Sequence, residues 1–572
     1  MFNAAGEPVG GVTSNFLLEK TRVTLQGKDE RNYHIFYQML AGGFPELMEQ
    51  CQLQGAHEYA YLAQSGCYEV SGIDDRKEFQ EVIQAMNTIK MDGHEQWYIF
   101  TCLAAILQLG NVKLQGRDAP AQLGNGSQYY LEMAAYLFGV DPASLMNAIT
   151  HKTIQMGGRR ASVVNVPQNA DQATQIRDAL AKEMYSRIFN LIVYRINQVM
   201  HTRENAPGMT IGILDIYGFE IFKQNTFEQL CINYTNEKLQ SIFIELVVKG
   251  EQREYHNEGI PWKDIAYFDN KVVCELIEGA NPPGIMRVLD DTCRSLHAVD
   301  SDTADKKFIE KLSMTGIASH PHLRILSSTS AHSAAFTIKH YAGDVTYSCQ
   351  GFAFKNMDNL FNSLVNCMKQ SSNPFVAQLW ANDDDAAKQP TTSSQKIRKS
   401  GAALVSSLMR CKPHYIRCIK PNEQKQPMTM DIKRTLHQVR YLGLVENVKI
   451  KKSGYSYRAT YDEFLQRFYY LYPNPQQLQG GRGGAQVLAQ HISKKYGAEI
   501  PMSEWAFGKT KVFVSSPSTV FMLEEYREEK MDPKAYAAKV REHENVEKMA
   551  EAQEKKVSTR SSGGVCGSCV IS

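Results

Sequence analysis

The most constraining feature of this sequence is a short apolar run that leads through a glycine turn into a long helix. Residues Met209 to Ile216 are mostly apolar, which is typical of a strand buried on both faces of a sheet. Thr226 and Gln229 have the spacing of a capping box, and apolar residues follow at positions 227, 230, 231 and 234. The region therefore predicts a buried strand, a tight turn, a short link and a long helix.

The turn carries two carboxylates around a glycine, in the order Asp215-Ile216-Tyr217-Gly218-Phe219-Glu220. A carboxylate at the carboxyl end of a strand can hold a water molecule of a magnesium shell. Gly218 has no side chain, so its amide can approach a phosphate closely. Glu220 could tie the turn to a cation. The alternative is an acidic turn without a ligand, which the hexapeptide by itself favours.

Other segments predict the surrounding elements. Apolar spacing indicates helices at 30–40, 97–109 and 171–200, the first two of which end at glycines. Residues 336–348 alternate around Ala-Gly-Asp, which predicts a hairpin. Residues 381–400 are polar without periodicity, acidic first and basic last, which predicts a surface loop.

Composition excludes several classes of protein. The net charge of +2 gives no global field that would attract nucleic acid, so we expect no such partner. The 12 cysteines have neither a disulfide framework nor a zinc pattern, so reduced intracellular thiols are expected. We find no signal peptide and no apolar stretch long enough to span a bilayer. These features predict a soluble protein of the cytoplasm.

The residues after the turn resemble a known family. Phe219 to Gln240 closely resembles the switch II and relay-helix signature of myosin motors, in a form similar to class I. Further similar motifs follow the family's order, namely Leu18–Val23, Glu30–Gln38, His340–Val345, Lys355–Asp358, Pro413–Asn422, Gln438–Leu444 and Gly508–Phe513. The resemblance extends from residue 6 to about residue 525.

The resemblance implies an α/β fold, with a P-loop NTPase-type twisted central sheet surrounded by helices, a converter and a helical tail. It implies an actin-activated ATPase that moves along actin filaments, with localisation at the actin cytoskeleton. The implied divisions are an upper actin-binding half (1–208), switch II with the relay helix and the lower actin-binding half (209–385), the surface loop 2 (386–399), a post-loop helix with a strand and the hinge helix (400–453), the converter (454–515) and a short lever or tail (516–572).

The resemblance also assigns roles at the turn. Asp215 would hold the Mg²⁺ shell through water, and the Gly218 amide would donate to the γ-phosphate of ATP. Glu220 would pair with an arginine of switch I when the site closes. The relay helix, at 227–247, would pass this closure to the converter with Gly443 as hinge; the alternative for Gly443 is a simple helix end.

The sequence departs from the family at the phosphate site. It contains no Gly-x-x-x-x-Gly-Lys-[Ser/Thr], and Gly508-Lys509-Thr510 is a false match because Ser503 stands where the first glycine belongs. The switch I cluster is also missing, and family order puts both motifs upstream, so we expect the chain to begin just after switch I. Phosphate binding in this fold needs that loop. We therefore expect no ATP hydrolysis at a motor's rate from this polypeptide, and the alternative function is a membrane-anchored, non-hydrolysing pseudo-motor that binds actin.

Two segments resemble actin contacts of the family. Pro283, Ile285 and Met286 match an exposed apolar tip, for which the alternative is a buried helix start. Basic residues near the loop 2 position would meet acidic actin, although such a run is usually only solvated surface. The implied set is Lys388, Lys396, Arg398, Lys399, Leu404, Leu408, Lys412 and Arg417.

Ser162 follows two arginines, in Arg159-Arg160-Ala161-Ser162, and lies sixteen residues before Asp178. The family carries an acidic or phosphorylatable residue there, on an actin-facing loop, and the arginines suit a basophilic kinase. Phosphorylation would add about −1.5 to −2 charges. The alternative is an ordinary polar loop serine.

The tail differs from a myosin lever. Residues 515–556 contain no Ile-Gln-x-x-x-Arg site, which argues against calmodulin or light-chain binding. The chain ends Cys569-Val570-Ile571-Ser572, a pattern for farnesylation, and Cys566 could be palmitoylated. Two lipids would suffice for stable membrane attachment. The alternative is an unmodified terminal cysteine.

Overall fold

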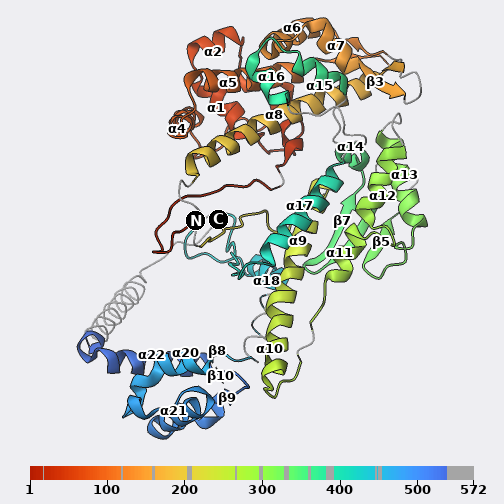
Figure 1. Cartoon of the computed structure of the whole chain (residues 1–572). Coiled ribbons are helices and arrows are strands. Elements are labelled where there is room, and N and C mark those ends of the chain that lie inside the picture. The colour runs from red at the N-terminus through yellow and green to blue at the C-terminus, as the bar shows by residue number, and fades with distance from the viewer. Residues whose placement is uncertain are drawn as a thin grey trace, which may run out of the picture. The chain divides into compact units, whose positions relative to one another are not determined.

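The structure is a computed structural model. It describes residues 1–537 apart from 17, 117–119, 157–161, 202–208, 265–266, 296–300, 327–333, 358–361, 382–391, 425, 443, 445–447 and 449–453. The chain forms two compact units (Figure 1). The first contains Met1–Leu239 and Asn270–Arg410, and the second contains Gln240–Asp269 and Cys411–Ser572. The boundary between the units therefore falls inside the predicted long helix.

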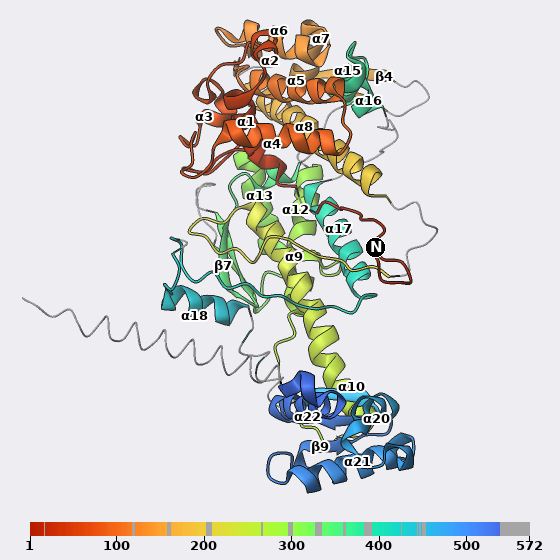
Figure 2. The same cartoon turned by 90° about the vertical axis from the view of Figure 1, so that its left-hand side faces the viewer.

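The larger core of the first unit is helical, with α5 buried among the other helices (Figure 2). A helix whose whole circumference is buried and mostly apolar, as α5 is from Ile99 to Leu109, must lie inside a core. The helices of this core are α1 (His34–Gly42), α2 (Pro45–Gln50), α3 (Ala60–Ala63), α4 (Asp75–Thr88), α5 (Gly93–Gly110), α6 (Ser127–Phe138), α7 (Pro142–Thr150), α8 (Ala170–Met200), α15 (Asn362–Lys369) and α16 (Pro374–Trp380). Its hairpins pair β1 (Leu114–Gln115) with β2 (Gln122–Leu123) and β3 (His151–Met156) with β4 (Ser162–Pro167).

The second core of the first unit packs helices on a three-stranded antiparallel sheet in the order β5-β6-β7. The strands are β5 (Leu323–Leu326), β6 (Ala335–His340) and β7 (Gly343–Ser348). The helices are α11 (Lys271–Glu278), α12 (Ile285–Ser295), α13 (Ser301–Met314), α14 (Phe352–Asn356), α17 (Ser393–Leu408) and the first part of α9 (Phe227–Phe243). Phe336 and Tyr347 face each other across β6 and β7 and are fully buried, which anchors the sheet in this core.

The second unit surrounds another small antiparallel sheet, in the order β8-β10-β9. Its strands are β8 (Tyr457–Thr460), β9 (Trp505–Phe507) and β10 (Lys511–Val514). Its α-helices are α10 (Gly250–Glu258), α18 (Ile432–Tyr441), α20 (Tyr461–Phe468), α21 (Gly481–Tyr496) and α22 (Pro517–Met531). A π-helical segment, Ile244–Lys249, joins α9 to α10. Such segments often mark functional positions in helices.

Most predicted helices and the hairpin are confirmed. The patterns at 97–109 and 171–200 correspond to α5 and α8, and the pattern at 30–40 corresponds to α1, which begins only at His34. The hairpin at 336–348 is β6 with β7. The predicted loop at 381–400 is wrong at its end, because the N-cap Thr392 starts α17 at Ser393. Its side chain accepts the amide hydrogen bond of Gln395.

The prediction of a buried strand at Met209–Ile216 is wrong for this structure. Met209 forms a bridge to Phe2, but no strand among the described residues lies along the rest of the run. Ile211 and Ile213 are 72% and 93% exposed. An apolar run becomes a strand only when a neighbour supplies the ladder hydrogen bonds, and that neighbour is not among the described residues.

The described residues combine helices with four small sheets of two or three strands. The predicted mixture of helices and strands is therefore present, but the described sheets do not include the expected twisted central sheet. No described helix is both long enough and apolar enough to pass through a bilayer.

Candidate functional site

The turn from Asp215 to Glu220 lies at the surface of the first unit. Asp215 and Gly218 are exposed, and Glu220 is half-buried. A Cβ atom built on Gly218 would meet no atom within 4 Å, so the described residues leave the space beside this glycine open. The turn therefore presents one exposed carboxylate and one accessible backbone amide, as the chemistry of a magnesium-phosphate ligand requires.

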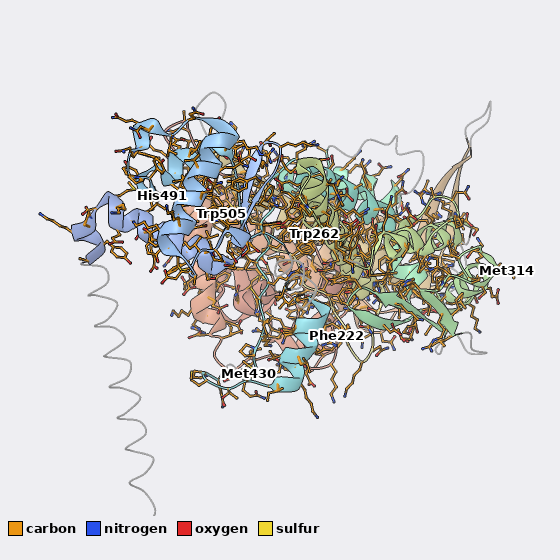
Figure 3. All side chains as sticks on the ribbon, turned by 90° about the horizontal axis from the view of Figure 1, so that it is seen from below. Phe222, Trp262, Met314, Met430, His491 and Trp505 are labelled. Atoms are coloured by element: carbon orange, nitrogen blue, oxygen red, sulfur yellow. The ribbon has the colours of Figure 1, made fainter. Side chains whose placement is uncertain are left out.

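Two buried asparagines fix the backbone after the turn. Asn233 of α9 accepts the Glu220 amide hydrogen through Oδ1 at 2.8 Å and donates from Nδ2 to the Glu220 carbonyl at 2.8 Å. Asn225 does the same for Phe222, at 2.8 and 3.0 Å. Each side-chain amide thus makes the pair of hydrogen bonds, one accepted and one donated, that the backbone of a neighbouring strand would otherwise make. The Phe222 ring itself is 55% exposed (Figure 3).

A chain of buried hydrogen bonds continues from Asn233 into the core. Asn233 Nδ2 also donates to Tyr347 Oη at 2.9 Å, and His340 Nε2 lies 2.8 Å from that oxygen. His340 Nδ1 lies 2.9 Å from Glu237 Oε1, with both side chains fully buried. The assignment that satisfies every group has Tyr347 donating to Nε2 and Nδ1–H donating to Glu237. We call Asn233, Tyr347, His340, Glu237 and Asn270 the buried relay network, because Asn270 Nδ2 also donates to Glu237.

Glu220 occupies an environment that favours its neutral form. Desolvation raises the pKa of Glu220, and the charges of Glu19 and Glu30 add to the rise. A hydrogen bond from Gln229 Nε2, at 3.3 Å, and the charge of Arg22 oppose it. Arg22 pairs with Glu19 at 2.9 Å and with Glu30 at 3.5 Å. Among the described residues, Glu220 has no ion pair, so its carboxylate remains suited to a further cation.

The predicted apolar tip is wrong in two of its three residues. Pro283 is exposed, but Ile285 and Met286 are 0% exposed. The reason is that α12 is strongly amphipathic and places both side chains in the second core, as the alternative expected. The exposed apolar side chain of this region is Met314, 85% exposed at the end of α13 (Figure 3). Met314 was not among the residues predicted from the sequence.

The predicted basic residues divide into exposed and paired ones. Lys396, Lys399 and Lys412 are exposed. Arg398 instead pairs with the buried carboxylate of Asp290 and keeps only 13% of its side-chain surface. This pair, with hydrogen bonds from Thr392 and Asn356 to Asp290, ties α17 to α12 and α14, so Arg398 is a packing residue here.

The other predicted residues are less informative. Leu404 and Leu408 are half-buried on α17. Arg417, in the second unit, stacks on Phe243 with its guanidinium 5.1 Å from the ring centroid. Ser162 opens β4, where it pairs with Met156. Lys388, Gly443, Cys566 and Cys569 lie outside the described residues.

Comparison with known proteins identifies a family. The family model described as Myosin head (motor domain) matches residues 1–515. The chain is 49% identical over 560 residues to the Myosin-K heavy chain of Dictyostelium discoideum, covering 98% of this chain and 64% of that protein. It is 45% identical to the Myosin IB heavy chain of the same organism and 45% identical to the Myosin heavy chain IB of Acanthamoeba castellanii. Each alignment covers 92% of this chain, but 47% and 44% of those relatives, so the chain spans less than half of their length.

Proposed function

Because the chain belongs to the myosin head (motor domain) family, we propose that it is a heavy chain that couples ATP hydrolysis to movement on actin filaments. The observation that supports this most directly is the double hydrogen bond between Asn233 and the backbone of Glu220. These bonds join α9 to the backbone of the turn, and not to a flexible side chain of the turn. A displacement of the turn is therefore transmitted to a helix whose far end belongs to the second unit.

ATP and Mg²⁺ are the ligands that fit the turn. Asp215 would hold a water molecule of the Mg²⁺ shell, and the Gly218 amide would donate to the terminal phosphate. The open space beside Gly218 supports this, because any other residue would place a side chain there. When bound, Mg²⁺ neutralises charge that develops on the phosphates. Glu220 would close the turn by pairing with an incoming arginine, which is supported by its half-buried carboxylate having no ion pair among the described residues.

The phosphate-binding part of the site is not supplied by this sequence, which contains no Gly-x-x-x-x-Gly-Lys-[Ser/Thr]. We therefore place the turn, the relay network and the actin surface in this chain. The test therefore supplies a phosphate loop and a switch I from elsewhere. An amino-terminal segment of a myosin motor that carries Gly-x-x-x-x-Gly-Lys-[Ser/Thr] and the switch I cluster is fused to Met1, and ATPase activity is measured with and without F-actin.

The fusion is expected to show actin-activated ATPase, whereas the chain alone is expected to show none above background. Asn233→Ala in the fusion is expected to reduce the activation by about tenfold or more, since it removes both hydrogen bonds to the Glu220 backbone and the one to Tyr347, at about 1 kcal/mol each. Asn236→Ala provides a graded comparison, because Asn236 is on the same helix face but makes only one hydrogen bond to the turn, to the Tyr217 carbonyl at 3.0 Å, and this bond is exposed. It is therefore expected to reduce the activation less than Asn233→Ala does. A fusion that binds actin without hydrolysis would instead support the non-hydrolysing tether.

We propose that actin meets Pro283 and Met314 together with the exposed lysines Lys396 and Lys399 of the first unit. Exposed apolar side chains provide desolvation energy at an interface, and lysines speed association with an acidic surface. Co-sedimentation with F-actin tests this on the chain as it is. Met314→Ser and Lys396→Glu/Lys399→Glu should each weaken binding, the second more strongly at low salt. Unchanged binding in both variants would exclude this surface.

Two modifications complete the proposal. Phosphorylation of Ser162 would add negative charge beside the β3–β4 hairpin and modulate actin activation; equal activation of Ser162→Ala and Ser162→Glu in the fusion would exclude it. Farnesylation of Cys569, with palmitoylation of Cys566, would anchor the chain to a membrane. Mass spectrometry of the cellular protein decides this, because prenylation removes the last three residues and an intact Ser572 contradicts it.

A further inference from the structure

One arginine of the second unit lies between two pairs of glycines, in the sequence Gly480-Gly481-Arg482-Gly483-Gly484. This segment begins α21, for which Gly480 is the N-cap residue and provides no side-chain hydrogen bond. Glycine is the poorest helix former after proline, because it has the most conformational freedom to lose. The first turn of α21 should therefore open more easily than the rest of the helix.

The local geometry requires only two of these four glycines. Gly481 has a φ of +70°, which favours glycine, and a Cβ atom on Gly484 would overlap the carbonyl oxygen of Gln479. Gly480 and Gly483 are exposed, have no positive φ, and would accept a Cβ atom that meets no other atom within 4 Å. Alanine at 483 would even stabilise the helix. A residue that breaks a local rule without a gain in packing indicates a functional reason.

The Arg482 side chain is exposed and weakly held. Its Nη2 donates to the carbonyl oxygen of Phe507, the last residue of β9, at 3.2 Å, which is the long end of the range for such bonds. Among the described residues, no carboxylate forms an ion pair with Arg482. Arg467 of the same unit is instead paired with Glu524 at 2.5 Å. The Arg482 guanidinium is therefore easily drawn away from the surface.

This setting meets the steric requirement of enzymes that transfer a group to arginine. Such an enzyme has to enclose the side chain in a narrow pocket down to its terminal nitrogens, so the flanking backbone must come against the enzyme surface. Side chains at the neighbouring positions would obstruct this approach, and a rigid helical turn would resist it. Two glycines on each side of Arg482 remove both obstacles. Access to Arg482 therefore accounts for the two glycines that the local geometry does not require.

We propose that Arg482 is a methylation site, modified by an arginine methyltransferase that uses S-adenosylmethionine as its methyl donor. In each transfer, a terminal nitrogen of the guanidino group attacks the methyl carbon. The bond from sulfur to that carbon breaks, its electron pair stays on the sulfur, and one N–H proton leaves to the solvent. The products are methylarginine and S-adenosylhomocysteine. The side chain keeps its positive charge but loses hydrogen-bond donors.

Methylation changes a contact within the second unit. A nitrogen that carries two methyl groups has no hydrogen left, so it can no longer donate to the Phe507 carbonyl. The Arg482 link between the first turn of α21 and β9 is then lost. The proposal is independent of the motor function, because neither the transfer nor its test involves ATP or actin.

The test uses the purified full chain from a bacterial host, a type I protein arginine methyltransferase, and S-adenosylmethionine with a tritiated methyl group. The chain is digested with a protease that does not cleave at arginine, and the peptides are identified by mass spectrometry. Methyl groups are expected on Arg482, and Arg482→Lys should abolish this label. Arg467 is the matched control, because its side chain is 50% exposed but is paired with Glu524 and has no glycine neighbour. It should stay unmethylated.

Gly483→Ala tests the role of the glycines. A Cβ atom fits at this position, so the variant should fold, and a firmer first turn should slow the methylation of Arg482 about fivefold. An unmethylated Arg482 in the unmodified chain, or equal methylation of Arg482 and Arg467, would overturn the proposal. An unchanged rate in Gly483→Ala would also overturn it, because access would then not depend on the glycines.

Methylation by the added enzyme shows access to Arg482, whereas methylation in the cell shows that the site is used. The chain isolated from its own cells is therefore digested and measured in the same way. A methylated Arg482 peptide is expected, and detection of this peptide in its unmethylated form alone would contradict the proposal.

Discussion

Replacing Glu237 by leucine should destabilise the second core of the first unit more than any surface change there. The carboxylate accepts hydrogen bonds from His340 Nδ1 at 2.9 Å, from the Tyr341 amide at 3.0 Å and from Asn270 Nδ2. Leaving three buried donors unpaired would cost about 1–3 kcal/mol each, and relaxation around them reduces the sum. We therefore expect a loss of about 4 kcal/mol, which is about three orders of magnitude in the equilibrium constant for opening.

The assay is amide hydrogen exchange of the peptides that cover 227–239 and 335–340. Glu275→Leu is the control, because its carboxylate is 64% exposed and lies 3.9 Å from Lys271, so the change should stay within about 0.5 kcal/mol. A cost for Glu237→Leu below about 1 kcal/mol would refute the reasoning, because it would show that the network contributes no more than surface contacts do.

Two further predictions concern titratable groups. The Glu228 carboxylate lies 2.7 Å from Lys355 Nζ. Burial acts to raise the pKa of Glu228, but the charge and hydrogen bond of the lysine lower it overall. The pair therefore stabilises the fold above the unfolded pKa of Glu228, and this contribution is lost as the pH falls through the folded pKa. In Lys355→Met, burial should dominate, so the pKa of Glu228 should be raised instead of lowered. The free energy of unfolding should then fall as the pH rises from about 4 to 7, by about 3 kcal/mol at neutral pH. A dependence of the melting temperature on pH that parallels that of the unmodified chain would contradict this. Burial raises the pKa of the Cys51 and Cys102 thiols to about 12, which leaves about one part in ten thousand as thiolate at pH 8. Maleimide should therefore label the exposed Cys418 long before either buried thiol, and peptide mass spectrometry measures the order of labelling. Labelling of all three at one rate would mean that the larger core of the first unit is open.

The helices could be predicted because their signals are local. The Thr226 amide donates to Gln229 Oε1 at 2.9 Å at the start of α9, as the capping-box spacing predicts. The apolar periodicity of α5 and α8 also lies within each helix. Both signals are complete in a window of a few turns, and tertiary packing only adds to them.

Burial at the predicted actin surface could not be assigned from the same local patterns. The apolar start of α12 was interpreted as an exposed tip, but an amphipathic helix shows only that one side is apolar, not whether that side meets a core or a partner. Arg398 was grouped with Lys396 and Lys399 because of its charge. Its pairing with Asp290, more than a hundred residues earlier, is a long-range contact that no local pattern contains.

The turn and the run before it show the same limit at the candidate site. The run from Met209 to Ile216 has the composition of a strand, but its ladder bonds need a distant neighbour, and most of it remains exposed. Glu220 and Phe222 obtain equivalent bonds from Asn233 and Asn225, which lie within the next thirteen residues. Buried asparagine is unusual inside a helix such as α9, so Asn233 was a signal that sequence reasoning could have used. Because these partners are local, the turn is fixed to α9 whether or not the strand is paired. The turn and the helix therefore form one preassembled module, and a sheet that later forms along the run would position that module rather than create it.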